Sequence, residues 1–210
     1  CMIIMHKIIN SFQQWAQEFP NVKIINDGTR RNEDRHGAVA CLQLTVKSCA
    51  VDDHLLVIGG DTLFREDFSL RKFTESFFEV QNKDKESHLV LSYQCKDEET
   101  SKYWILELDE DLKVQCMKEK PLLSETRSCN AVCFLLYCMI QDYISVLFVL
   151  IIRVNIFNVF RQSMGQSQAS RRPVYVLRIS GRFDVENLPS YIECDKYFRN
   201  QLQNPSVYLM

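Results

Sequence analysis

The stretch LLVIGGDTLF, residues 55–64, holds the residues best suited to chemistry. Its apolar half runs into Gly59 and Gly60, and Asp61 follows with the hydroxyl of Thr62 beside it. A short, continuous apolar run is typical of a strand buried on both faces. The glycines allow a sharp turn and the close approach of a ligand, which makes Gly60 a binding candidate. A carboxylate at the carboxyl end of such a strand suits a magnesium ion that holds phosphates, although a plain turn after a strand would look the same.

Two further stretches place polar residues after predicted strands. The stretch RISGRFDVENLPSYIECDKYF, residues 178–198, continues a short apolar run into a turn, then Asp184, and then an apparent helix. The triplet Glu-Lys-Pro at 119–121 follows another predicted strand. Such a triplet occurs by chance in many proteins, so it is informative only together with other landmarks.

Taken in order, these landmarks resemble the sugar-1-phosphate nucleotidyltransferases, also called NDP-sugar pyrophosphorylases. The matching stretches are NDGT at 26–29 with RHGA at 35–38, IGGDTLF at 58–64, EKP at 119–121, and GRFDVENLPSYIECDKYF at 181–198. The resemblance implies a doubly wound α/β fold of the Rossmann-like nucleotidyltransferase type, with a mostly parallel sheet. It also implies transfer of a nucleotidyl group from an NTP to a sugar 1-phosphate, with release of pyrophosphate.

The resemblance also implies roles for particular residues. Asp61 and Asp184 would be catalytic and would hold one Mg²⁺ against the phosphates. Glu119 would accept hydrogen bonds from sugar hydroxyls, and Lys120 would pair with the sugar phosphate. Gly37, with Ala38 after it, would let the nucleotide base approach the backbone. Each residue also has an ordinary structural alternative: a turn aspartate, an exposed ion pair at a strand end, or a glycine in helix packing.

One family landmark has no counterpart in these residues. The family opens with a strand and a loop of the type GxGTRxxPxT, whose backbone N–H groups cradle the triphosphate. Gly28-Thr29-Arg30 is only superficially similar, and the chain begins with Cys1. An N-terminally truncated core with impaired activity is therefore expected. The alternatives are a non-catalytic nucleotide-sugar-binding or regulatory relative, or a truncated splice product, which could bind an intact paralogue or assemble as a homo-oligomer.

The stretch FLLYCMIQDYISVLFVLIIRVNIFNVFR, residues 134–161, departs from the family in composition. Its longest uninterrupted apolar part, 144–152, is short of the roughly 20 residues that span a bilayer. A longer window back to Ala131 includes Gln141 and Asp142, and a central Asp costs about 2.5–3.5 kcal/mol on insertion. A buried helix or strand is the commoner outcome. A membrane-associated segment and a segment of foreign origin remain alternatives.

Composition agrees with a cytoplasmic α/β protein. The 210 residues are 46% hydrophobic, and the net charge of −2 gives no general basic face for nucleic acid. The nine cysteines form no pair of CxxC motifs, so zinc is unsupported. An odd number of cysteines without a secretory leader favours reduced thiols in the cytosol.

Hydrophobic periodicity predicts alternating helices and strands, which favours parallel strand pairing. Helices are expected at 6–19 and 36–48, around the phenylalanines of 68–78, and from Pro189; strands are expected at 22–26, 54–58, 89–95, 103–108, 112–118 and 174–179. Asp109-Glu110-Asp111 is expected to be a solvated turn rather than a metal site. The predicted organisation is a partial core at 1–130, the hydrophobic segment at 131–161, a linker at 162–171, the rest of the core at 172–199 and a tail at 200–210.

Overall fold

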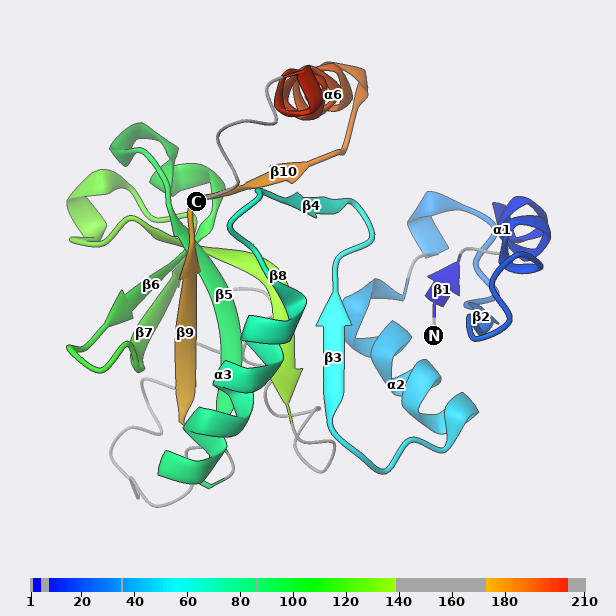
Figure 1. Cartoon of the computed structure of the whole chain (residues 1–210), viewed down its shortest axis with the longest axis horizontal. Helices are drawn as coiled ribbons and strands as arrows, with labels where there is room; N and C mark the ends of the chain where they lie inside the picture. The colour runs from blue at the N-terminus through cyan, green and yellow to red at the C-terminus, as the bar shows by residue number, and fades with distance from the viewer. Residues whose placement is uncertain (1, 5–7, 35, 86, 139–172, 204–210) are drawn as a thin grey trace. The chain divides into compact units, whose positions relative to one another are not determined.

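A computed structural model describes residues 2–4, 8–34, 36–85, 87–138 and 173–203 (Figure 1). The chain divides into two compact units. The first lies within residues 1–55, and the second contains residues 56–138 and the C-terminal part from residue 170. The predicted sites at residues 61, 119, 120 and 184 all belong to the second unit, so this unit alone determines how those side chains are placed.

The first unit contains a small strand–helix–strand arrangement. Its elements are β1 (Met2–Ile4), α1 (Ile9–Ala16), β2 (Ile24–Asn26), a 3₁₀ turn (Asn32–Asp34) and α2 (Gly37–Cys49). β1 and β2 pair in parallel, with Met2 opposite Ile24, as a helical crossover between two strands requires. Ile9 and Ile25 are buried. The predicted helices and the strand are confirmed, with α1 shorter than the stretch 6–19.

The second unit is built around a mixed sheet. Its strands are β3 (Leu55–Ile58), β5 (His88–Gln94), β6 (Trp104–Leu108), β7 (Val114–Glu119), β8 (Asn130–Cys138) and β9 (Val174–Ile179). The order along the sheet is β7-β6-β8-β5-β9, and β3 also pairs with β8. The α/β class is confirmed. β9 is parallel to β5, but β8 is antiparallel to both β5 and β6, so this sheet is not mostly parallel as the sequence suggested.

A tight turn explains part of that difference. The Asp109 side chain accepts hydrogen bonds from the backbone N–H groups of Asp111 (3.0 Å) and Lys113 (2.9 Å), which makes β6 and β7 an antiparallel hairpin. Strands joined by so short a turn cannot be parallel. Hydrogen bonds from the backbone N–H groups of Lys113 and Asp111 and from the Gln115 side chain hold the pKa of Asp109 below its ordinary value, with the Lys113 N–H contributing most. The expected solvated turn at 109–111 is therefore confirmed.

The helix α3 (Leu70–Lys83) supplies the core packing on the sheet. The Ser69 hydroxyl accepts a hydrogen bond from the Lys72 N–H at the helix start, the usual role of an N-cap serine. Phe73 and Phe77 are fully buried and pack in one cluster with residues of β5, β8 and β9. Phe73 and Phe77 thus belong to the core, as predicted, whereas Phe78 of the same helix is 46% exposed.

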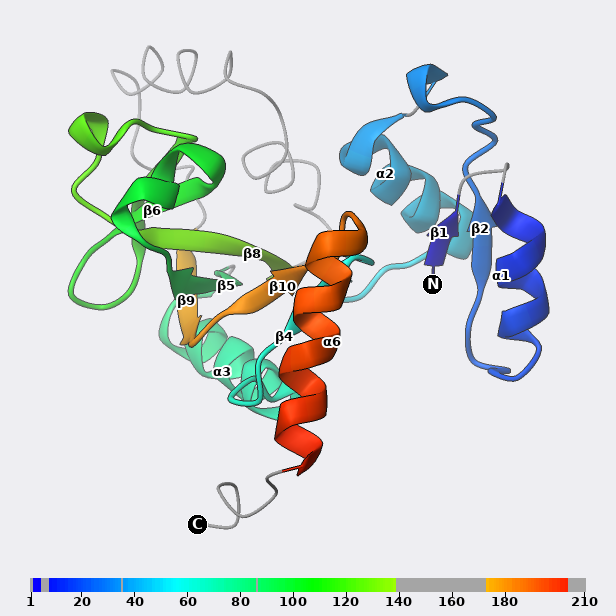
Figure 2. The ribbon, with the colours of Figure 1, turned by 90° about the horizontal axis from the view of Figure 1, so that it is seen from above.

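Two short strands that the sequence analysis did not predict complete the second unit. β4 (Thr62–Phe64) and β10 (Arg182–Asp184) pair antiparallel as a separate two-stranded ribbon. The helix α6 (Leu188–Gln203) follows and lies beside this ribbon (Figure 2). The ribbon therefore receives one strand from each of the two stretches that carry the predicted aspartates.

The hydrophobic segment begins inside the fold. Phe134–Cys138 is part of β8, which lies between β5 and β6, so this part is a sheet strand. Residues 139–161, the predicted linker 162–171 and the end of the predicted tail lie outside the described residues. Within the described parts of the chain, none of the helices combines the length and the apolar character needed to cross a membrane.

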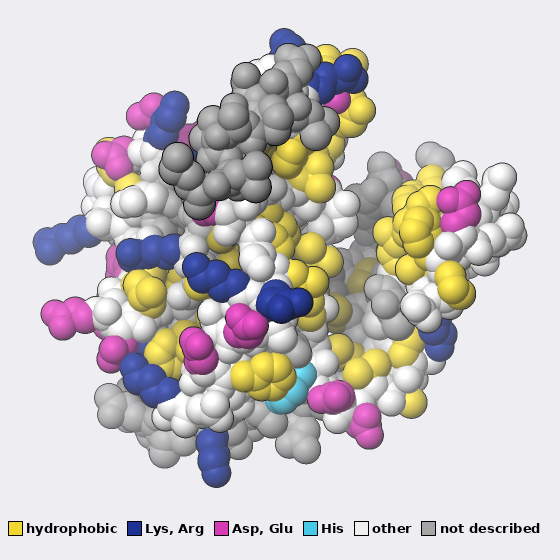
Figure 3. Space-filling model, viewed as in Figure 1, with side chains coloured by type: hydrophobic (Ala, Val, Ile, Leu, Met, Phe, Trp, Pro, Cys, Tyr) yellow, Lys and Arg dark blue, Asp and Glu magenta, His cyan; other side chains and the backbone are white. Residues whose placement is uncertain are grey.

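Side chains of both charges are interspersed on the face drawn in Figure 3, and hydrophobic side chains also reach the surface. Over the described residues as a whole, the most exposed large hydrophobic side chains include Leu188, which is 69% exposed, and Leu122, which is 60% exposed. The interspersed charges agree with the small net charge of −2.

Candidate functional site

The two predicted metal-binding aspartates come from neighbouring strands. In the β4–β10 ribbon, Asp184 lies opposite Thr62. The Val185 N–H donates to the Asp61 carbonyl oxygen at 2.8 Å. Asp61 is exposed and Asp184 is partly exposed. Two aspartates separated by more than 120 residues in sequence therefore occupy adjacent backbone positions.

Hydrogen bonds hold the other end of the β4–β10 ribbon, where Ser180 and Gly181 contact the segment that follows β4. The Asp67 carboxylate accepts two hydrogen bonds from Ser180, from the backbone N–H at 2.6 Å and from the hydroxyl at 2.8 Å. The Arg65 N–H donates to the Gly181 carbonyl oxygen at 3.2 Å. A Cβ on Gly181 would lie 3.0 Å from the Arg65 Nε, so the glycine allows this close packing. The turn before Asp184 is thus fixed against the segment after Asp61.

Arg182 is a site residue that the sequence analysis did not single out. Its Nη1 lies 2.8 Å from the Asp184 Oδ2, and its side chain is only 11% exposed. Burial lowers the pKa of Arg182, but the opposing effect of Asp184 and other neighbours leaves it raised, so the guanidinium stays charged. Residues i and i+2 of a strand share one face, so the position of Arg182 beside Asp184 follows once β10 is known to be a strand.

Aromatic side chains surround this ion pair. The Arg182 Cζ lies 5.9 Å from the centroid of the Tyr103 ring, and Tyr103 packs edge-on against Tyr93. Burial is the main reason why the pKa of Tyr93 is strongly raised. Burial also raises the pKa of the Cys133 thiol to about 12. Tyr93 and Cys133 are therefore neutral at physiological pH, so the charges here belong to Arg182 and Asp184.

Glu119 and Lys120 lie at the end of β7, next to the same tyrosine. Glu119 pairs with Trp104 across the hairpin, and the Lys120 N–H donates to the Tyr103 carbonyl oxygen at 2.9 Å. The Glu119 Oε2 is buried and has no hydrogen-bond partner among the described residues. Lys120 has a φ of 44°, which is the left-handed region that costs most residues energy. Tyr103 thus contacts Lys120 through its backbone and Arg182 through its ring.

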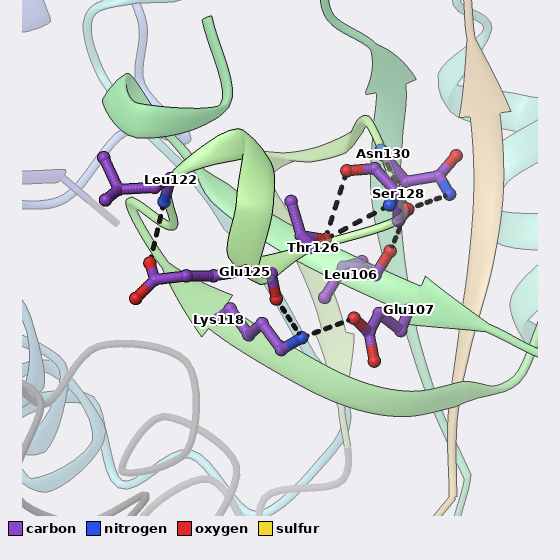
Figure 4. Close-up of polar contacts among 8 residues, drawn as sticks. All are labelled: Leu106, Glu107, Lys118, Leu122, Glu125, Thr126, Ser128 and Asn130. Carbon is purple, nitrogen blue, oxygen red and sulfur yellow. Dashed lines mark hydrogen bonds and ion pairs between the residues drawn. The ribbon is translucent and has the colours of Figure 1, made fainter. Parts of the chain in front are cut away.

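The loop after these residues is held by polar contacts (Figure 4). The Lys118 ammonium pairs with Glu107 at 2.7 Å and donates to the Glu125 carbonyl oxygen. The Glu125 carboxylate accepts the Leu122 N–H at 2.8 Å. The Ser128 hydroxyl donates to the Leu106 carbonyl oxygen at 2.6 Å. These bonds fix the chain on both sides of Glu119 and Lys120.

The remaining predicted residues are glycines and a loop. In the second unit, a Cβ on Gly60 would meet nothing within 4 Å, so the space there is open. In the first unit, Gly37 begins α2 with a φ of 75°. The stretch 26–29 forms local turns, in which the Asp27 carboxylate accepts both the N–H and the hydroxyl of Thr29.

The chemistry of the donors fits Mg²⁺. This ion takes oxygen ligands and commonly uses one or two carboxylates together with substrate phosphates. Asp61, just before β4, and Asp184, at the end of β10, supply two carboxylates from adjacent backbone positions. A cluster of three or more ligating side chains, as zinc sites use, is absent from the described residues. The pair is thus the kind of site that a phosphate-bound magnesium ion would complete.

Known structures share this fold. A protein assigned as a glucose-1-phosphate thymidylyltransferase from Bacillus anthracis, crystallised with sucrose, superimposes with a TM-score of 0.61 at 19% identity, covering 94% of this chain and 75% of that chain. An apo UDP-glucose pyrophosphorylase superimposes with a TM-score of 0.61 at 17% identity, covering 96% of this chain and 82% of that chain. A CMP:2-keto-3-deoxy-manno-octonic acid synthetase in complex with CTP superimposes with a TM-score of 0.57 at 11% identity, covering 91% of this chain and 77% of that chain.

The sequence comparisons identify a family but no individual curated relative. A comparison with curated proteins found no match. The family model described as nucleotidyl transferase matches residues 1–146, more than half of the chain. These residues include β4 with its preceding Asp61, and Glu119 and Lys120 at the end of β7. The chain belongs to the nucleotidyl transferase family.

Proposed function

We propose that this chain acts on nucleotides and sugar 1-phosphates, as a nucleotidyltransferase of the sugar-1-phosphate type that requires Mg²⁺. The single observation that carries the proposal is the β4–β10 pairing, which brings Asp61 and Asp184 to adjacent backbone positions in a chain of the nucleotidyl transferase family. Two of the similar structures are named as enzymes of this type. The resemblance of EKP at 119–121 to the family landmark supports the sugar-phosphate side of the reaction.

Each residue has a defined task in this proposal. Bound Mg²⁺ would neutralise charge on the phosphates as the sugar phosphate oxygen attacks the α-phosphorus and pyrophosphate leaves. Asp61 and Asp184 would hold the ion. Glu119 would accept hydrogen bonds from sugar hydroxyls through its buried oxygen, which lacks a partner among the described residues. Lys120 would pair with the sugar phosphate. Positioning of this kind can lower a barrier by about 7–11 kcal/mol.

A binding role without turnover is the alternative. The observation that favours it is local: Gly28-Thr29-Arg30, the nearest counterpart of the GxGTRxxPxT loop in these residues, lies in a segment where Thr29 is bonded to the Asp27 carboxylate. A regulatory relative would bind a nucleotide or nucleotide sugar and act through an intact paralogue or a second copy. The cytoplasm is the compartment proposed for either role.

Two measurements on the full chain test the proposal. Pyrophosphate release is followed with a panel of NTPs and sugar 1-phosphates, and nucleotide binding is titrated with and without Mg²⁺. We expect binding that requires Mg²⁺ and is lost in Asp61→Asn and in Asp184→Asn, with slow or absent turnover. Metal-dependent affinity that is unchanged in both variants would contradict the metal assignment. Turnover at enzyme-like rates would exclude the purely regulatory role.

A further inference from the structure

One carboxylate of the proposed metal site already has a cationic partner. The Arg182 Nη1 lies 2.8 Å from the Asp184 Oδ2, and the side chains are 11% and 34% exposed respectively. Both lie on one short strand, β10, on the same face. Because a partly buried ion pair is screened less by salt and water than an exposed one, Arg182 influences any second cation that approaches Asp184.

Arg182 also has hydrogen-bonding capacity that its neighbours do not use. Its Nε is buried and finds no acceptor among the described residues. The guanidinium lies over the Tyr103 ring, which limits how far it can move. A guanidinium offers five N–H donors in a planar fork that matches phosphate oxygens. A buried donor without a partner is costly, so an anionic oxygen is the group that this position lacks.

These observations give Arg182 a role in the proposed reaction, and that role rests on the proposed function. We propose that Arg182 is a specificity-determining residue: it opposes the binding of a bare divalent cation at Asp184 and favours a cation that arrives with a triphosphate. A positive charge next to the metal repels it, whereas the phosphates neutralise both cations and accept the unused N–H donors. Metal binding and phosphate binding thereby become coupled, and such coupling is reciprocal.

The test uses the full chain with Mn²⁺ as the metal probe, because free Mn²⁺ is counted directly by electron paramagnetic resonance. Inorganic tripolyphosphate is the phosphate probe, since it carries no base or sugar. Arg182→Met and Arg182→Gln remove the charge, and Arg182→Lys keeps the charge without the planar fork. Arg178→Met is the matched control, because Arg178 is an exposed arginine on β9. Thermal melting checks that every variant is folded.

We expect the uncharged variants to bind Mn²⁺ alone at least about fivefold more tightly than the wild type, because a repelling charge is gone. The Mn²⁺ affinities of Arg182→Lys and Arg178→Met should stay within about twofold of the wild-type value. Tripolyphosphate should tighten Mn²⁺ binding strongly in the wild type and much less in Arg182→Met.

The results distinguish a failure of the role of Arg182 from a failure of the proposed metal site. Mn²⁺ affinity that is unchanged or weaker in both uncharged variants would overturn the role of Arg182, and so would an equal gain from tripolyphosphate in wild type and Arg182→Met. If Asp184→Asn removes Mn²⁺ binding while the Arg182 variants behave as wild type, only this inference fails. If neither Asp61→Asn nor Asp184→Asn changes Mn²⁺ binding, the metal site of the proposed function fails with it.

Discussion

Lys120 combines a strained backbone with a side chain that the proposal gives a binding role. Its φ of 44° lies in the left-handed region, which costs about 1–2 kcal/mol for a residue with a Cβ. We expect Lys120→Gly to raise the free energy of unfolding by about 0.5–1 kcal/mol, measured by urea titration. Lys120→Ala is the control, because it also removes the charge but keeps the strain. Equal stability of the two variants would show that the backbone stores no strain here.

The two Lys120 variants also separate stability from binding. Both remove the ammonium group, so both should weaken binding of a sugar 1-phosphate while only one gains stability. Retained strain at a ligand-contacting position is a common feature of functional sites. Unchanged sugar 1-phosphate affinity in both variants would remove Lys120 from the proposed site.

Cys129 illustrates a second residue-scale effect, on thiol reactivity. Its Sγ donates to the Asp97 Oδ1 at 2.9 Å, and this hydrogen bond is the main reason why its pKa is raised to about 11. The thiolate is the reactive form, so little of it exists at pH 8 and iodoacetamide should modify Cys129 slowly, with a rate that rises through pH 9–11. Asp97→Asn should speed the reaction several-fold at pH 8. Glu98→Gln, one residue along, is the control; if it accelerates the reaction equally, the Asp97 bond is not the cause.

At the scale of elements, the β4–β10 ribbon depends on Asp67. This carboxylate accepts two bonds from Ser180, and hydrogen bonds to charged groups are worth about 1.5–3 kcal/mol when they are not fully exposed. Asp67 is exposed, so we expect Asp67→Ala to lower the free energy of unfolding by only about 1 kcal/mol. It should also weaken Mn²⁺ binding at Asp61 and Asp184, because the ribbon that places them is loosened.

The control for the ribbon is an aspartate of similar exposure that lies far from it in the sequence. Asp111→Ala removes an exposed ion pair with Lys83 and should leave Mn²⁺ affinity unchanged. If Asp67→Ala also leaves Mn²⁺ affinity unchanged, Asp61 and Asp184 are placed by contacts other than those between Asp67 and Ser180.

The same ribbon marks how far sequence alone could go. The long periodic helices and the apolar strands β3, β5 and β9 were predicted from their patterns, whereas Asp61 and Asp184 were paired as metal ligands through the family resemblance. β4 and β10 were missed because three residues show no periodicity. Arg182 was missed for the same reason, since only a known strand puts it on the face of Asp184. The mixed pairing of the sheet was missed because alternation of helices and strands does not reveal hairpins.

At the scale of the whole molecule, the hydrophobic segment 134–161 divides at the end of β8. Leu136 and Tyr137 pair with β5, and β8 lies between two other strands, so replacing the whole segment would remove the part of β8 that follows Cys133. Residues 139–161 contain ISVLFVLII, a β-branched and aromatic run without proline or charge. Such runs promote aggregation when they are exposed.

The last prediction follows from this division. A chain in which a short polar linker replaces residues 139–161, with β8 and β9 kept whole, should give more soluble protein and melt within a few degrees of the original. A chain in which the linker replaces 134–161 is the matched comparison and should lose cooperative unfolding, because β5 would lose the part of its antiparallel neighbour that pairs with Leu89 and Val90. Soluble yield and calorimetric melting of the three chains decide the matter. If the shorter replacement also abolishes cooperative unfolding, residues 139–161 are an integral part of the fold and the aggregation-prone interpretation is wrong.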